Sequence, residues 1–239
     1  MKARAVTDIG RERSINQDYV YYSLTEVGCL PNLFIVADGM GGHKAGDMAS
    51  RYTVETIVSL IKESAGKDPI SIISNAVTEV NARLLDKAKE SEDYQGMGTT
   101  LVVATISDHI LKVANVGDSR LYVVGDEITQ ITRDHSLVEE MVSLGEIDRK
   151  EARTHAQKNI ITRAIGGYEH VEAEIFSVDL KENDKIIMCS DGLTNMIEDT
   201  DILRIVKSGT ELESTADKLI EVANSNGGRD NISVIMIEP

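Results

Sequence analysis

The sequence is poor in residues that cross-link or interrupt a chain, with two cysteines, three prolines and no tryptophan among 239 residues. Cys29 and Cys189 are too few for a disulfide framework, and both lie among apolar residues, which favours a reducing cytoplasm. No Pro/Ser-rich linker, internal repeat or low-complexity tract divides the chain. We therefore expect a single domain over residues 1–239, acting in the cytoplasm as a monomer.

Positive charge is also scarce. Lys and Arg number 25 against 40 Asp and Glu, which gives a formal net charge of -15. Such a surface repels phosphate backbones and anionic lipid headgroups, so we expect neither nucleic acid nor a membrane as partner. Long apolar runs are missing too, because residues 1–14 lack a signal-peptide core and the longest run near them covers only 33–37. The sequence predicts no signal peptide and no membrane insertion.

The remaining composition is that of an ordinary folded protein. Apolar residues make up 41% and charged residues 27%, which argues against disordered, collagen-like and coiled-coil chains. At this length, folding buries about 70% of the extended-chain surface. The chain is therefore long enough for a sizeable core.

Two long helices are predicted in the first half of the chain. Residues 45–65 repeat apolar and small side chains at helical spacing. Residues 68–90 do the same, with Asp68 as N-cap and Pro69 in the first helical position. We expect these two helices to pack against each other as a pair.

Strand patterns rich in Val, Ile and Thr follow, separated by short turns. The predicted strands cover 99–106, 109–116, 121–124, 185–189 and 231–237, and two later helices cover 200–207 and 212–225. Strand-like runs at both ends of the chain indicate a sheet shared between its two halves. Residues 134–166 break the pattern with short helical pieces, at 137–144 and 149–155, and we interpret them as an inserted, mobile subdomain.

Aspartates mark the ends of the apolar runs. Asp38, Asp118 and Asp191 each follow such a run, while Asp18 and Asp230 stand at the beginnings of strand-like runs. Aspartate is depleted in strands, and clustered carboxylates repel one another unless one is protonated or a cation neutralises them. If the strand ends meet, a divalent cation with oxygen ligands explains all five aspartates.

A simpler interpretation is open for each aspartate taken alone, because Asp-Gly at a strand end is typical of a hairpin turn. Gly125-Asp126 fits that interpretation. Asp38 and Asp191 are each followed by glycine and then by a predicted helix, which favours a site. The missing side chain of Gly39 would let its carbonyl approach a metal.

The same residues form an ordered series of eight motifs over nearly the whole chain. They are Arg13-x-x-Asn16-Gln17-Asp18, Val36-Ala37-Asp38-Gly39-Met40-Gly41-Gly42-His43, Gly98-Thr99-Thr100, Ala114-Asn115-Val116-Gly117-Asp118-Ser119-Arg120, Asp134-His135-Ser136, Ala164-Ile165-Gly166, Ser190-Asp191-Gly192-Leu193 and Gly228-Arg229-Asp230-Asn231. This series resembles the metal-dependent protein phosphatase family (PPM, or phosphatase 2C), bacterial branch. Eight motifs in family order make a chance match untenable.

The resemblance implies an α+β fold, an α-β-β-α sandwich of two antiparallel sheets between helix pairs, with residues 134–166 as a flap beside the cleft. It implies two Mn²⁺ or Mg²⁺ ions bridged by Asp38, with the Gly39 carbonyl, Asp191 and Asp230 as further ligands. Asp18 would contribute through metal-bound water, and a third ion would use Asp118 and Asp191.

The resemblance also assigns catalytic roles. Two ions about 3.5 to 4 Å apart activate a water for in-line attack on phosphorus, so no protein nucleophile is needed. Arg13 would grip the phosphate in a bidentate clamp, although a plain surface arginine is the alternative. His43 is a candidate general acid for the leaving oxygen. Asp38, Arg13 and His43 are thus the expected catalytic residues.

The resulting hypothesis is a cytoplasmic phosphatase acting on phosphoserine and phosphothreonine in proteins, opposing a Ser/Thr protein kinase. One alternative is another metal phosphohydrolase, acting on small phosphate esters or on partner-switching regulators. Another is a catalytically silent binding module on the same fold. The glycine loop at 39–42 also invites a nucleotide-binding interpretation, but it matches neither phosphate-loop pattern.

Overall fold

The computed structural model describes residues 1–42, 45–66 and 68–239. Its strands form two antiparallel sheets. The first has the order β1 (Lys2–Asp8), β11 (Ile232–Glu238), β10 (Lys185–Cys189), β7 (Arg120–Val124) and β8 (Ile128–Gln130). The second has the order β2 (Asp18–Ser23), β3 (Leu33–Met40), β5 (Leu101–Ser107), β6 (Ile110–Val116) and β9 (Glu174–Asp179), and β4 (Gly98–Thr99) pairs with β3.

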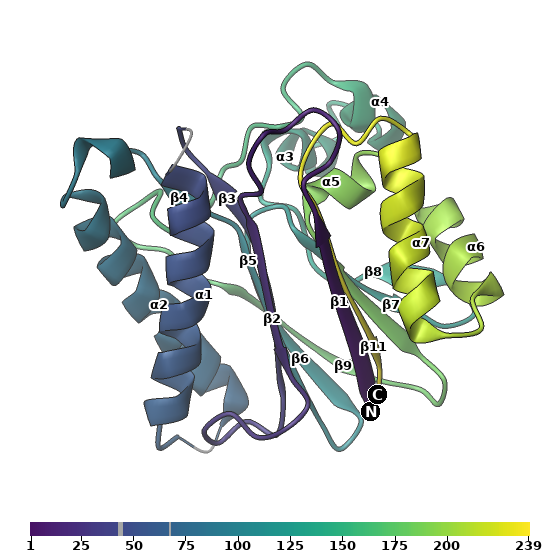
Figure 1. Cartoon of the computed structure of the whole chain (residues 1–239), viewed down its shortest axis with the longest axis horizontal. Coiled ribbons are helices and arrows are strands. Elements are labelled where there is room, and N and C mark those ends of the chain that lie inside the picture. The colour runs from purple at the N-terminus through teal and green to yellow at the C-terminus, as the bar shows by residue number, and fades with distance from the viewer. Residues whose placement is uncertain (43–44, 67) are drawn as a thin grey trace.

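Helices cover the outer face of each sheet (Figure 1). Helices α1 (Ala45–Glu63) and α2 (Pro69–Ala88) pack on the second sheet, followed by the 3-10 turn η1 (Glu92–Tyr94). Helices α6 (Asp199–Ser208) and α7 (Leu212–Ser225) pack on the first sheet. The short helices α3 (Leu137–Ser143), α4 (Arg149–Thr154) and α5 (Asp191–Thr194) lie at one end of the sheets. The predicted α-β-β-α sandwich is confirmed.

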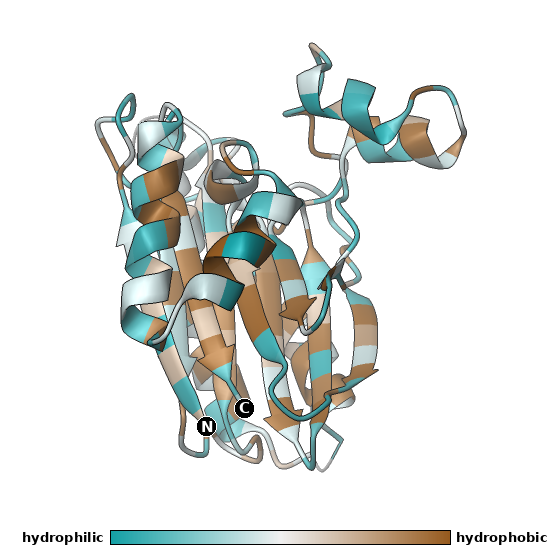
Figure 2. Ribbon diagram, turned by 90° about the vertical axis from the view of Figure 1, so that its right-hand side faces the viewer, coloured by the Kyte–Doolittle hydropathy of each residue, from teal (hydrophilic) through white to brown (hydrophobic). Residues whose placement is uncertain are grey.

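Successive side chains of each strand point to opposite faces of its sheet, and the apolar ones form three layers. Phe34 and Val36 of β3 point between the sheets, where they meet Ile186 and Ile235 from the first sheet. Their neighbour Ile35 points the other way, under α1 and α2. Successive residues of a strand face opposite sides, so one buried strand contributes to two cores. Figure 2 shows the resulting apolar bands along the strands.

The paired helices begin where the sequence predicts. Asp68 caps α2 by accepting the Ser71 backbone N–H at 2.9 Å, and Pro69 occupies the first helical position. Ile72, Ile73 and Val80 of that helix are buried against α1 and the sheet. The expected packing of the two helices as a pair is confirmed.

Some local expectations were wrong. Cys29 is exposed and not enclosed in an apolar core, whereas Cys189 is buried. His109 does not open β6 but stands in the preceding turn with a φ of 61°. Strand β9 had no counterpart among the predicted strands, because its residues are only partly buried and alternate weakly.

The segment 134–166 carries α3 and α4 at the end of the sandwich. Ser136 and Asp148 cap the two helices by accepting backbone N–H groups. Figure 2 shows these short helices standing apart from the strands. Among the described residues, no helix is long and apolar enough to cross a membrane. The division into one domain with a flap subdomain stays a prediction.

Candidate metal centre

Asp18 and Asp38 are partners across two neighbouring strands. Asp18 begins β2 and pairs with Asp38 near the end of β3. The Asp38 backbone is fixed by the Gly-Thr-Thr motif, because its N–H donates to Thr100 Oγ1 at 2.9 Å and its carbonyl accepts from Thr99 Oγ1 at 2.9 Å. Pairing and hydroxyl contacts thus place two carboxylates at one end of the second sheet.

Asp191 arrives from the other sheet. It follows β10 and opens the short helix α5. The preceding Ser190 donates its hydroxyl to Asp18 Oδ2 at 2.7 Å, which ties this sheet to the first carboxylate pair. Asp191 Oδ2 accepts from Asn195 Nδ2 at 2.9 Å. The two sheets therefore meet through polar contacts at their shared end.

Asp230 and Arg13 are held by two loops, 9–17 and 226–231. The Arg13 guanidinium donates to Asp230 Oδ2 at 2.9 Å. Asn231 joins the loops, since its Oδ1 accepts the Gln17 N–H at 2.9 Å and its Nδ2 donates to the Ile9 and Ile15 carbonyls, each at 3.0 Å. This amide holds together the two loops that bring Arg13 to Asp230.

Asp118 lies in the turn after β6 and is buried. The turn is clamped by His135, whose Nδ1 accepts the Gly117 N–H at 3.0 Å and whose backbone N–H donates to the Gly117 carbonyl at 3.0 Å. His135 in turn contacts Glu174 at 3.1 Å. His135 therefore holds the turn that carries Asp118.

Burial and mutual repulsion raise the pKa values of four of these carboxyls. Burial raises the pKa of Asp18 to about 7, and that of Asp191 to about 6 with help from Asp230. For Asp38, burial and the charges of Asp18 and Asp191 hold the pKa well above its usual range. Burial and Asp191 do the same for the pKa of Asp118. These four carboxyl groups are close enough to repel one another electrostatically, and a bound cation would offset that repulsion.

The donor set fits a hard divalent cation. Asp18 Oδ1 and Asp191 Oδ1 are both buried and accept no hydrogen bond. An anionic oxygen without a partner is costly in a protein interior, and carboxylate oxygens are the ligands that Mg²⁺ and Mn²⁺ prefer. Within the described ranges, however, no three acidic, histidine or cysteine side chains already stand at the spacing of a closed ligand shell. The carboxylates are thus close to one another, and two of their oxygens accept no hydrogen bond from the described residues, but they do not yet form a complete ligand shell.

Gly39 is required for a reason the sequence did not reveal. A methyl group on its Cα would lie 2.0 Å from the Gly46 carbonyl oxygen and 2.7 Å from that of Gln17. The end of β3 therefore packs directly on the first turn of α1, and only glycine fits. Ligation through the Gly39 carbonyl stays a prediction.

The sequence profile described as protein phosphatase 2C matches residues 10–232. The chain belongs to the protein phosphatase 2C family. It is 40% identical to the serine/threonine phosphatase stp of Listeria monocytogenes, over 100% of this chain and 96% of that relative.

Solved structures agree with this assignment. The serine/threonine phosphatase Stp1 from Staphylococcus aureus superposes with a TM-score of 0.93 at 34% identity, covering 100% of this chain and 95% of that one. The catalytic domain of the serine/threonine protein phosphatase PstP, solved with two manganese ions, has a TM-score of 0.86 at 33% identity, covering 98% of this chain and 96% of that one.

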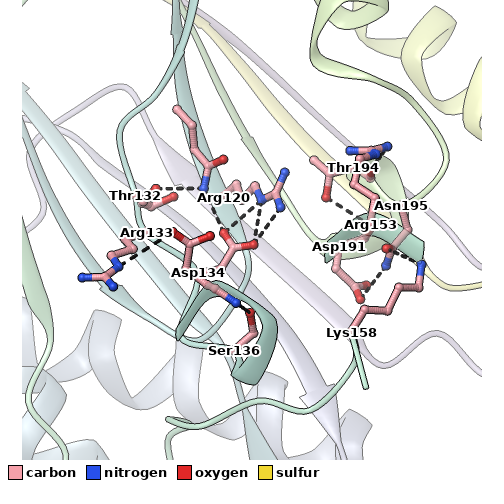
Figure 3. A network of polar contacts seen from close by, with 12 residues as sticks. Arg120, Thr132, Arg133, Asp134, Ser136, Arg153, Lys158, Asp191, Thr194 and Asn195 are labelled. Carbon is pink, nitrogen blue, oxygen red and sulfur yellow. Dashed lines mark hydrogen bonds and ion pairs between the residues drawn. The ribbon is translucent and has the colours of Figure 1, made fainter. Parts of the chain in front are cut away.

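In this phosphatase 2C chain, segment 134–166 is tied to α5 and to Asn195, the residue that follows it. Lys158 Nζ donates to Asn195 Oδ1 at 2.9 Å, and Arg153 donates to the Thr194 carbonyl at 3.0 Å (Figure 3). Asn195 is the same side chain that holds Asp191. On the other side of the view, Arg120 forms a bidentate pair with Asp134, with Nη2 to Oδ2 at 2.7 Å.

The structure brings Asp18, Asp38, Asp191 and Asp230 together, with Asp118 beside Asp191 and Arg13 on Asp230. His43 lies outside the described residues. The supporting roles of Ser190, Asn195 and Asn231 were missed, although Ser190 and Asn231 belong to quoted motifs. Ser190 and Asn231 carry no charge, so their side chains gave no sign of a role in the site.

Proposed function

We propose that this chain is a metal-dependent protein phosphatase that hydrolyses phosphoserine and phosphothreonine in proteins. The observation that carries the proposal is the group of buried aspartates at the meeting point of two sheets, with Asp18 Oδ1 and Asp191 Oδ1 unpartnered. Membership of the phosphatase 2C family and the serine/threonine phosphatases among its relatives support the same activity.

Asp38, Asp191, Asp230 and the Gly39 carbonyl would hold two Mn²⁺ or Mg²⁺ ions, with Asp18 acting through water. When bound, such a pair supplies an activated water and neutralises charge developing on phosphorus. Arg13 orients two phosphate oxygens, and for that it must turn at least partly from Asp230, its partner at 2.9 Å. His43 is the proposed donor of the proton to the leaving serine or threonine oxygen.

A third ion is proposed at Asp118 and Asp191, since burial and the charge of Asp191 raise the pKa of Asp118. Asp118→Ala should leave two ions bound but lower turnover on phosphopeptides, with partial recovery at high Mn²⁺. Anomalous scattering counts the ions, and steady-state rates give the turnover. If the variant keeps full turnover and three occupied positions, Asp118 only shapes its turn.

The alternatives are less favoured. A silent binding module has no need for buried carboxylates with unpartnered oxygens, which are costly without a cation. A small-ester phosphohydrolase would share the metal chemistry but not the close kinship to serine/threonine phosphatases. We therefore retain phosphoproteins as the substrate class, with a Ser/Thr kinase as the opposing enzyme. Action as a monomer in the cytoplasm is part of the proposal, and both cysteines are unpaired.

The deciding experiment compares phosphoserine and phosphothreonine peptides with a small aryl phosphate, in Mn²⁺ and in excess EDTA. We expect peptide hydrolysis in Mn²⁺, little in Ca²⁺ because its looser coordination positions water poorly, and none in EDTA. Asp38→Asn should reduce turnover by about 100-fold or more. Asp126→Asn, in the turn between β7 and β8, is the matched control and should behave as wild type. Full activity in EDTA would reject the metal mechanism.

A further inference from the structure

Two loops gather three arginines beside Asp230. Loop 9–17 carries Arg11 and Arg13, and loop 226–231 carries Arg229. The Arg11 backbone N–H donates to the Gly228 carbonyl at 2.6 Å, so the loops are in contact. Figure 1 shows them side by side beyond the ends of β1 and β11.

The side chains of Arg11 and Arg229 flank the same turn. A methyl group added at Gly228 would lie 2.8 Å from Arg11 Cγ, and one added at Gly227 would lie 3.8 Å from Arg229 Nε. Both arginines are exposed. Both therefore lie at the Gly227–Gly228 turn, and Arg229 directly precedes Asp230, the partner of Arg13.

These two arginines lack an acidic partner. Arg13 is paired with Asp230, whereas in the described part of the chain no ion pair or side-chain hydrogen bond engages Arg11 or Arg229. The nearby Asp8 is occupied, because its Oδ1 accepts from the Gly10 N–H and from Asn224. Besides Asp230, the two loops contain one further acid, Glu12, which is exposed. The two loops thus carry three arginines against two acids, Glu12 and Asp230, which is a net charge of +1 in a chain whose net charge is -15.

We propose that Arg11 and Arg229 form a subsite, the arginine subsite, for an anionic side chain close to the phosphorylated residue of the substrate. The inference rests on the proposed function. Arg11 is two positions from Arg13 in the chain, and Arg229 adjoins Asp230, which Arg13 contacts at 2.9 Å. A peptide whose phosphate lies at Arg13 advances about 3.3 Å per residue, so the residues within a few positions of the phosphate are the ones expected to meet the subsite. The strongly acidic surface repels an acidic peptide elsewhere, and guanidinium groups bind carboxylate or phosphate in the same forked geometry.

The test uses four phosphoserine peptides of equal length in Mn²⁺. One has alanine on both sides, one has three aspartates before the phosphoserine, one has three after it, and one carries a second phosphoserine. The readout is kcat/KM for each acidic peptide divided by that for the alanine peptide. For the wild type we expect a ratio of about 3 to 10 at low salt on the favoured side, falling towards 1 as salt screens the charges.

Variants assign the preference to the subsite. The double variant Arg11→Ala/Arg229→Ala should bring the ratio to about 1, and the single variants Arg11→Gln and Arg229→Gln should each lower it. Arg204→Ala, an exposed arginine of α6, is the matched control and should keep the ratio. Glu12→Gln should raise it. Because each ratio is taken within one variant, a loss of turnover common to all peptides cancels.

The outcomes separate cleanly. A ratio near 1 for every acidic peptide in the wild type, or a preference that survives the double variant, would overturn the subsite. A preference for the doubly phosphorylated peptide alone identifies phosphate as the anion, and a preference for aspartate as well identifies any anionic side chain. Hydrolysis of none of the four peptides would contradict the proposed function, whereas equal hydrolysis of all four contradicts only the subsite.

Discussion

Asp18 shows what one carboxylate costs the chain before a cation binds. It is 5% exposed, receives one hydroxyl from Ser190 and leaves Oδ1 without a partner. Burial raises its pKa from 3.8 to about 7. A pKa higher in the folded than in the unfolded state means that folding takes up a proton between these values. The carboxylate therefore costs nothing near pH 4 and its full penalty above pH 7.

Asp18→Asn should accordingly stabilise the metal-free protein in a pH-dependent way. We expect the variant to melt at nearly the same temperature as the wild type near pH 4, and about 8–16 °C higher at pH 8, for a gain of about 4 kcal/mol. Thermal melts in EDTA across this range measure the difference. In saturating Mn²⁺ the sign should reverse. A constant difference between pH 4 and pH 8 would show that Asp18 does not titrate as described.

Arg13 is paired with Asp230 in this structure, and in the proposed mechanism it also binds the phosphate of the substrate. Arg13→Ala should raise KM for phosphopeptides and lower kcat/KM by about 10- to 100-fold, because the bidentate grip is lost. Calorimetric Mn²⁺ affinity should stay or increase, since Asp230 loses a competing cation. Arg13→Lys should recover only part of the loss. Arg83→Ala, on the outer face of α2, is the control for removing an exposed, ion-paired arginine. Wild-type efficiency in Arg13→Ala would return Arg13 to a plain surface residue.

At the scale of elements, the short helix α5 positions Asp191 by packing its second residue on β11. A methyl group at Gly192 would lie 2.0 Å from the Asn231 carbonyl oxygen, a backbone atom that cannot turn aside. The close approach of helix and strand is therefore possible only with glycine at this position.

Gly192→Ala should push α5 off β11 and carry Asp191 away from Asp18. We expect a loss of about 2–4 kcal/mol in stability and a clear weakening of Mn²⁺ binding. Gly42→Ala is the matched control, because no atom of the described residues lies within 4 Å of the added methyl group. Denaturant melts and Mn²⁺ calorimetry check both variants. Equal stability and equal Mn²⁺ affinity in the two variants would contradict this account of α5.

The elements also show where sequence reasoning succeeds. The pattern from Ile72 to Leu84 and the cap at Asp68 depend on local spacing, and both were predicted correctly. The predicted strand at 99–106 is instead two strands, because Thr99 and Thr100 turn their hydroxyls to Asp38. Contacts such as Arg13 with Asp230, 217 positions apart, have no local signal. The motifs predicted the candidate site residues, but only the structure identified the residues that hydrogen-bond to them and hold them in place.

At the scale of the whole molecule, metal binding and folding are linked. The aspartates come from both sheets and from the loops beside them, so a cation that binds them bridges the two halves of the sandwich. A ligand that binds only the folded state stabilises it by about 2.7 kcal/mol at a concentration 100 times its dissociation constant.

Saturating Mn²⁺ should therefore raise the melting temperature by about 5–11 °C over the protein in EDTA. The increase should grow with the logarithm of the Mn²⁺ concentration and should be absent in Asp38→Asn/Asp191→Asn. Differential scanning calorimetry measures both. A melting temperature that Mn²⁺ does not change would mean that the carboxylates hold no ion in the folded protein.

The pairing of β1 with β11 also sets the order in which the protein matures during synthesis. Lys2 lies opposite Glu238, so β1 stays unpaired until β11 has been made, and β10 lacks one neighbour until the same point. Asn231, which joins the loops of the site, immediately precedes β11 and is made 214 positions after Gln17, the residue whose backbone it binds. Long-range pairing of this kind is slow and leaves strand edges open to other chains. The growing chain therefore holds an incomplete sheet and no finished metal centre until residues 231–238 have been added.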